Sequence, residues 1–205
     1  MQFVDSDHPA VIAFAERATA GATTDRDKAV ALYYAVRDGI RYDPYTASAN
    51  PADYTGSAVL EAGSAYCIPK AVLLCAAARA VGLTCRLGFA DVRNHLTTEK
   101  LRQRMKGSDL FPWHGFVEFR LDGRWVKATP AFNIELCERF GVLPLEFDGE
   151  HDSLLHPFTV DGRDHMEYVN DRGTFDELPF DDIMRDLLET MDVDEPPPAD
   201  TFRPA

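Results

Sequence analysis

The sequence lacks the cysteine patterns that build disulfide scaffolds and metal sites. Its 205 residues include only four cysteines, Cys67, Cys75, Cys85 and Cys137. No two of them have C-x-x-C spacing, and none precedes a histidine at metal-ligand distance, so no structural zinc site is expected. Four cysteines in a chain of this length do not suggest a disulfide framework either. We therefore expect free thiols in a reducing compartment, with no metal and no cofactor.

The sequence also lacks long hydrophobic runs and an excess of positive charge. The longest apolar stretch, 71–83, contains Arg79 and is too short to span a bilayer. The N-terminus carries charge already at Asp5 and Asp7, unlike a secretory signal. Lys and Arg number 21 against 34 Asp and Glu, and this acidic surface repels nucleic acid and anionic membranes. We expect a cytoplasmic protein without nucleic-acid or membrane partners, and its oligomeric state stays open.

Helix signals dominate the first eighty residues. Asp7 and Thr24 are predicted to be the N-caps of two amphipathic helices. The connection 41–66 is rich in Tyr, Pro, Ser and Asn, and it is either a functional loop that covers a site or a plain surface loop. A third helix is predicted to begin at Cys67, because Pro69 is tolerated only in a helix's first turn. This helix is apolar on nearly all sides, so we expect it at the centre of the fold.

Strand signals dominate the rest of the chain. Two β-rich runs flank Asp122-Gly123, a strong hairpin signal, and a third run precedes the polar segment 94–107, which is predicted to be a surface insertion. Helices first and antiparallel strands after them predict an α+β domain, with the central helix packed on an antiparallel sheet. One domain over 1–191 and a disordered Pro-rich tail over 192–205 are expected. Further short strands and turns are predicted in PLEFDG, HPFTVDGRDHMEYV and GTFDEL. NIELCERFG is predicted to be a short helix that ends at Gly141, and PFDDIMRDLLETM a final helix.

Residues 63–70, GSAYCIPK, place the thiol of Cys67 at the N-terminus of a predicted helix. The unpaired N–H groups and the macrodipole of a helix N-terminus lower the pKa of a thiol, and the same groups can stabilise an oxyanion. A nucleophilic Cys67 needs a histidine within reach. His114 opens the run HGFVEF beside Trp113, where a strand would hold its ring rigidly. For either residue alone, a purely structural role is the simpler interpretation.

Taken together, these residues resemble the transglutaminase-like superfamily, whose core is papain-like. The matching text is GSAYCIPKAVLLCAAARAVGLTCRLGFA, then WHGFVEFRLDGRWVKATP, with AVALYYAVRDGIRYD as the lead-in helix. The resemblance covers about residues 25–135. It implies a papain-like fold in which Cys67 is the nucleophile and His114 the general base and then acid. It also implies an amide substrate, from a peptide, a protein or a small molecule, and a thioester intermediate.

One position departs from the family pattern. The family usually has an aspartate just before the proline of KATPAF, where it orients the histidine; here the residue is Thr129. Three options follow: the Thr129 hydroxyl holds the imidazole, another residue such as Asn133 does so as in Cys-His-Asn proteases, or activity is lost. The predicted function is therefore cysteine-dependent acyl transfer, either hydrolysis or transfer to an amine. The alternative is a catalytically inactive binding module.

Three aromatic residues are candidates for substrate binding. Trp113 is expected to line the substrate channel or shield the oxyanion, and Tyr66 and Tyr54 are expected to line the cleft. Plain packing is the competing interpretation for Trp113, and loop tyrosines are common. The sequence shows no calcium loop of the D-x-[DN]-x-[DN]-G type, so calcium activation is not indicated.

Overall fold

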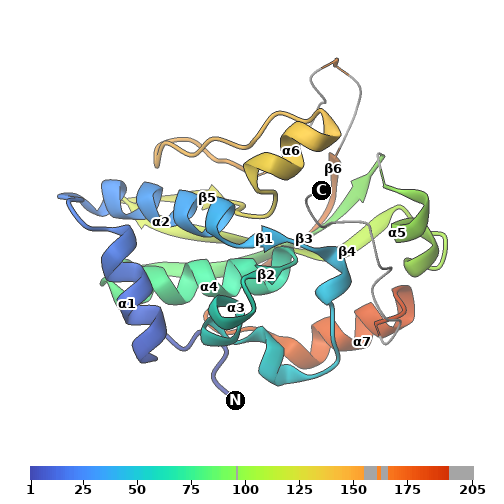
Figure 1. Ribbon diagram of the computed structural model, residues 1–205, viewed down its shortest axis with the longest axis horizontal. Helices are drawn as coiled ribbons and strands as arrows, with labels where there is room; N and C mark the ends of the chain where they lie inside the picture. Colours follow the sequence, from blue (N-terminus) through green and yellow to red (C-terminus); the bar gives the residue numbers. More distant parts are fainter. Residues whose placement is uncertain (96, 155–160, 163–165, 194–205) are drawn as a thin grey trace.

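A computed structural model describes residues 1–95, 97–154, 161–162 and 166–193 of the chain (Figure 1). The helices are α1 (Pro9–Ala18), α2 (Asp25–Gly39), α3 (Gly56–Ala62), α4 (Cys67–Ala80), α5 (Glu99–Arg104), α6 (Ile134–Phe140) and α7 (Phe180–Thr190), with two 3-10 turns, η1 (Pro44–Thr46) and η2 (Pro51–Tyr54). The strands are β1 (Arg41–Tyr42), β2 (Ser64–Ala65), β3 (Cys85–Asn94), β4 (Leu110–Leu121), β5 (Arg124–Ala128) and β6 (Met166–Phe175).

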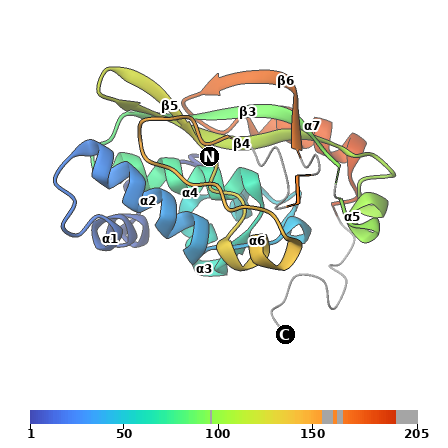
Figure 2. The same ribbon diagram turned by 90° about the horizontal axis from the view of Figure 1, so that it is seen from above.

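Four strands form an antiparallel sheet in the order β5-β4-β3-β6, and β1 and β2 form a separate short parallel pair. Helix α4 packs against β3 and β4 on one side and against α1, α2 and α3 on the other (Figure 2). Every residue from Cys67 to Ala78 is buried, because the helix has neighbours on all sides. This arrangement confirms the predicted α+β class, with the cysteine-bearing helix central and packed on the sheet.

Local signals placed several element ends correctly. Strands β4 and β5 are joined at Asp122 and Gly123, both with positive φ, as a tight hairpin turn requires. Thr24 caps α2 through a reciprocal capping box with Asp27. The prediction for α1 was wrong by one residue: His8, not Asp7, is its N-cap, because the His8 ring nitrogen accepts the N–H of Ala10.

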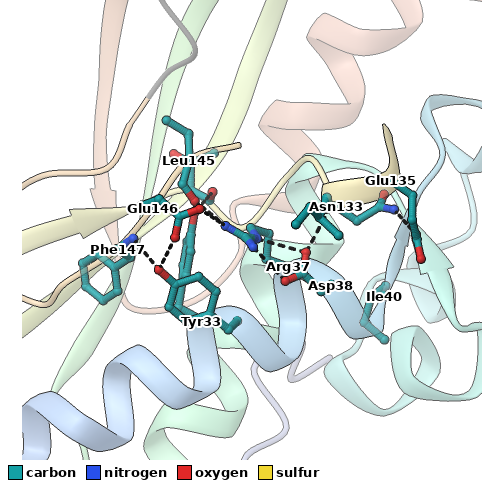
Figure 3. A network of polar contacts seen from close by, with 12 residues as sticks. Tyr33, Arg37, Asp38, Ile40, Asn133, Glu135, Leu145, Glu146 and Phe147 are labelled. Carbon is teal, nitrogen blue, oxygen red and sulfur yellow. Dashed lines mark hydrogen bonds and ion pairs between the residues drawn. The ribbon is translucent and has the colours of Figure 1, made fainter. Parts of the chain in front are cut away.

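The segment 144–149, predicted as a strand, has no strand structure. Its backbone groups bond to side chains of α2 instead of to a strand (Figure 3). The Leu145 carbonyl accepts hydrogen bonds from Arg37 at 2.6 Å and from Tyr33 at 2.9 Å. The Phe147 amide donates to the hydroxyl of Tyr34 at 3.1 Å. Polar side chains of α2 thus hold this segment in place, although its composition alone suggested a strand.

Three further expectations are revised. The connection 41–66 is not one loop, since it contains β1, η1, η2, α3 and β2. Strand β6 is continuous over Met166–Phe175, although separate short strands were predicted there. Of the predicted segment HPFTVDGRDHMEYV, residues 156–160 and 163–165 lie outside the described part. The segment 94–107 is not simply a surface insertion, because Leu101 and Met105 are buried.

The predicted tail lies outside the described residues from 194 onward. The two residues before that point are attached to α5. The amide of Asp192 donates to the carbonyl of Arg104 at 3.0 Å, and the Arg104 guanidinium donates to the carbonyl of Val193 at 3.2 Å. In the described part of the chain, no helix has the length and apolar character to cross a membrane.

Candidate active site

Cys67 is the first residue of α4 and is only 9% exposed. The side chain of its N-cap residue, Tyr66, makes no hydrogen bond to the first-turn amides of the helix. Interactions with the backbone amides of Gly115, Ile68 and Cys67 itself lower the pKa of the thiol, as expected at a helix N-terminus. Burial has the larger effect and raises that pKa to about 11. The resting thiol is therefore protonated at neutral pH, contrary to the acidic thiol that its position in the helix predicts.

Gly115 brings β4 into contact with the first turn of α4. A Cβ atom at Gly115 would lie 3.1 Å from the Cα of Ile68 and 3.2 Å from the carbonyl oxygen of Cys67. Such distances are shorter than most real Cβ contacts, so any side chain at this position would require the strand or the helix to shift by a few tenths of an ångström. The neighbour of Gly115 in the strand is His114, and the close approach brings Cys67 and His114 to one small cavity whose wall contains both.

His114 lies within β4, which begins at Leu110, and does not open the strand as predicted. The pairing of β3 with β4 shifts register just before it, and Trp113 has a φ of 61°. His114 is 5% exposed, and its burial lowers the pKa of the imidazole to about 4. No described residue makes a hydrogen bond to its buried Nε2 atom. At neutral pH a neutral thiol and a neutral imidazole line the same cavity.

A buried polar network fixes Trp113 in its strained conformation. The Trp113 amide donates to the carboxylate of Asp91 at 3.2 Å, and its indole Nε1–H donates to Asp186 at 2.9 Å. The guanidinium of Arg172 lies 4.8 Å above the indole ring and donates to Asp91 at 2.8 Å. Strands β3, β4 and β6 and helix α7 thereby hold the residue that precedes His114. Trp113 is not part of the cavity wall.

The two candidates for orienting the imidazole have different surroundings. Thr129 is buried, and its Oγ1 atom has no hydrogen-bond partner among the described residues. The Asn133 side chain accepts the amide of Tyr42 at 3.0 Å and donates to Glu135 at 2.7 Å (Figure 3). The contacts of Asn133 are therefore to β1 and α6, and none of them is to His114.

The predicted tyrosines Tyr66 and Tyr54 line two cavities, and Tyr66 borders both. Tyr66 lines the cavity that contains Cys67, and its hydroxyl lies 2.8 Å from that of Tyr54. Tyr54 lines a neighbouring cavity of about 250 Å³, which Tyr66 also borders. Tyr42, which sequence reasoning missed, lines the cavity with Cys67 and is packed edge-on against Phe132.

Sequence reasoning also missed the apolar wall of the cavity. Leu101 and Met105 contribute from α5 and its C-cap, and Leu187 and Met191 from α7 and its C-cap. In each pair the residues are four positions apart, so they share one helix face. Apolar residues four positions apart in otherwise polar segments indicate that one face of each helix is buried.

The chain belongs to the transglutaminase-like superfamily. The family model described as "Transglutaminase-like superfamily" matches residues 12–130, more than half of the chain. This match includes α4, β3, β4 and β5, and it ends before β6 and α7. No curated protein matches the sequence.

One solved structure supports the fold, and a second is reported with it. A candidate cysteine protease from Cytophaga hutchinsonii has a TM-score of 0.52 at 12% identity, over 86% of this chain and 45% of that one. A candidate protease from Parabacteroides distasonis has a TM-score of 0.44 at 15% identity, over 62% of this chain and 24% of that one. The chain thus spans less than half the length of either protein, and at these identities the likeness concerns the fold alone.

Proposed function

We propose that this protein is a cysteine-dependent acyl-transfer enzyme that acts on amide bonds. The observation that carries the proposal is that Cys67 and His114, from different elements, line one buried cavity at the start of α4. The glycine contact between β4 and α4 supports it, because a purely structural cysteine needs no such approach. Membership of the transglutaminase-like superfamily supports the same reaction class.

The first half-reaction forms a thioester. The Cys67 sulfur attacks the amide carbonyl while His114 accepts the thiol proton, so the neutral pair acts by general-base catalysis and not as a preformed thiolate. The uncapped amides at the start of α4 would bind the developing oxyanion. His114 then gives its proton to the leaving nitrogen as the C–N bond breaks. In the second half-reaction, water or an amine attacks the thioester while His114 accepts a proton from it, and His114 gives that proton to the sulfur as the C–S bond breaks.

A second function, that of an inactive binding module, is favoured by one observation. The Nε2 atom of His114 and the Oγ1 atom of Thr129 are both buried without a partner in the described residues, at the place where the family's aspartate is missing. An imidazole without an anion gains a proton less easily, which weakens it as a base. On this alternative the cavity binds a partner without turnover.

Acylation by 4-nitrophenyl acetate separates the two functions, because this small donor needs no side-chain pocket. We expect release of 4-nitrophenol with an acetyl group on Cys67, located by peptide mass spectrometry and removed by hydroxylamine. His114→Gln should slow acylation by about 100-fold or more, the usual contribution of a general base. Cys137→Ala, which alters a buried cysteine of α6, should leave the rate unchanged. Equal rates in wild type and His114→Gln would favour the binding module. Adding a primary amine then distinguishes transfer from hydrolysis.

A further inference from the structure

The cavity beside Cys67 has a wall that is unusual for so acidic a protein. None of the described residues that line it is Asp, Glu, Lys or Arg, although the chain carries 34 acidic and 21 basic residues. Its polar contributors are the thiol, His114, Asn94 and two tyrosines. The hydroxyl of Tyr66 already bonds to Tyr54. Besides the reacting pair, the described wall offers a charged or strongly polar ligand group only the neutral side chains of Asn94 and Tyr42.

Most of the wall is aliphatic or thioether surface. Three methionines contribute, together with branched side chains and an aromatic ring, from α5, α7 and the ends of β3, β4 and β6. The apolar members are Pro44, Val92, Leu101, Met105, Phe111, Pro112, Met166, Leu187 and Met191. Methionine is unbranched and polarisable, so such walls adapt to ligands of somewhat different shape. Burying a charged group against this surface without a partner would be strongly unfavourable.

The cavity is small and its outer walls are tied together. It is partly open, and its inner space of about 40 Å³ corresponds to roughly three water-sized groups. Lys106 donates to the carbonyl of Leu188 at 3.0 Å, and the Asp192 amide donates to the carbonyl of Arg104, so α5 is fastened to the end of α7. A cavity of this size suits a short aliphatic side chain better than an aromatic one.

We propose that this cavity binds a short, uncharged aliphatic side chain on the acyl part of the substrate. The inference rests on the proposed function. The acyl part stays bonded to Sγ in the thioester, so a pocket with Cys67 in its own wall is available to it through both half-reactions. Met166, Leu187 and Met191 lie beyond the family match at 12–130, so part of this wall comes from the chain that the family match does not cover.

The test uses N-acetylated amino-acid chloromethyl ketones that differ only in the side chain: leucine, valine, phenylalanine, glutamine, aspartate and lysine. Cys67 displaces chloride from the chloromethyl carbon and forms a thioether, while the thiol proton passes to His114. The rate of modification at Cys67 is measured on the full chain by peptide mass spectrometry. Each rate is divided by that of chloroacetamide on the same variant, which removes the intrinsic reactivity of the thiol.

We expect the leucine and valine reagents to react at least about tenfold faster than the glutamine, aspartate and lysine reagents, because burial of an unpaired polar group is costly. Phenylalanine should also be slower in the wild type. Leu187→Ala enlarges the pocket and should reverse the leucine-over-phenylalanine preference. Leu188, the next residue of α7, is 48% exposed and does not line the cavity, so Leu188→Ala should leave this preference unchanged. Should Leu187→Ala fail to fold, Leu187→Val makes a smaller change with the same expected direction.

The outcomes separate this inference from the proposed function. Suppose the glutamine or a charged reagent reacts as fast as leucine, while His114→Gln still slows chloroacetamide at Cys67. The aliphatic pocket is then wrong, and the acyl-transfer function stands. If His114→Gln has no effect on Cys67 with any reagent, the proposed function fails. A leucine preference that Leu187→Ala does not alter would overturn the assignment of this wall.

Discussion

Gly115 touches the helix that carries the candidate nucleophile: a Cβ atom there would lie 3.1 Å from the Cα of Ile68. Gly115→Ala should therefore push β4 away from α4 by a few tenths of an ångström and move His114 relative to Cys67. We expect at least a tenfold loss in the rate of Cys67 modification, with a loss of about 1–3 kcal/mol in the free energy of unfolding from overpacking.

Gly39→Ala is the matched control. Gly39 is the last residue of α2, and a Cβ atom there would meet nothing within 4 Å. This variant should leave the modification rate unchanged and stabilise the protein by at most about 1 kcal/mol. Chloroacetamide labelling and urea unfolding measure both quantities. A Gly115→Ala protein that labels at the wild-type rate would show that the strand-helix contact does not position the pair.

The network around Trp113 should position His114 through the backbone. Asp91→Ala removes the acceptor for the Trp113 amide, for Arg172 and for the side-chain amide of Asn170, and leaves these three donors without that partner. We expect a loss of about 2–3 kcal/mol in the free energy of unfolding, together with slower labelling of Cys67. Asp181→Ala, on the exposed start of α7, is the control and should change neither quantity appreciably. A stability loss with unchanged labelling would mean that the network is only structural.

Thr129 occupies the position where the family usually has an aspartate. Thr129→Asp should place a carboxylate near the unpartnered imidazole and raise the pKa of His114 by roughly 1–3 pH units. A stronger base should then speed labelling of Cys67 at neutral pH. Thr129→Asn offers a similar shape without charge and should not reproduce the gain. An NMR titration of His114 reads the pKa directly, and an unchanged value would show that position 129 does not face the ring.

His114 should make the protein sensitive to acid. Burial lowers the pKa of its imidazole to about 4, from an ordinary value near 6.5, so the folded state binds this proton less well than the unfolded state. The free energy of unfolding should thus fall as the pH drops below 6.5 and continue to fall until about pH 4. Between pH 7 and 4.5 the loss due to His114 should be about 2 kcal/mol.

Urea unfolding of wild type and His114→Gln at both pH values isolates this contribution, because titrations shared by the two proteins cancel. The wild type should lose about 2 kcal/mol more than the variant on acidification. If both proteins lose the same amount, the imidazole titrates as an exposed histidine does, and its burial has no effect on its pKa.

The elements that could be predicted from sequence are those with strong local signals. The apolar run after Cys67 predicted a central helix, Asp122-Gly123 predicted a hairpin, and Thr24 predicted a helix start. Each depends on residues within one turn or one helix. The strand prediction for segment 144–149 failed, because its backbone forms hydrogen bonds with side chains of α2, which are far away in the sequence.

The sequence indicated which residue types form the site, but it did not indicate the surroundings of those residues. A cysteine at a helix start, together with a later strand-like run that begins with a histidine, indicated the pair Cys67 and His114. Both residues line one cavity. The thiol pKa was not predictable, because burial by β4 and the cavity wall outweighs the helix N-terminus. The contacts of Asn133 depend on β1 and α6, which meet only in the folded chain.

The central claim is that His114 takes the proton of Cys67, and the pH profile of Cys67 modification tests it most directly. Chloroacetamide labelling of wild type and His114→Gln would be followed by peptide mass spectrometry from pH 4 to 10. We expect the wild-type rate to persist through neutral pH and to fall only near the imidazole pKa of about 4. In His114→Gln, labelling should be at least about 100-fold slower at pH 7 and should rise only as the pH approaches the thiol pKa of about 11. Identical profiles in the two proteins, rising near the ordinary thiol pKa of about 8.5, would contradict the claim.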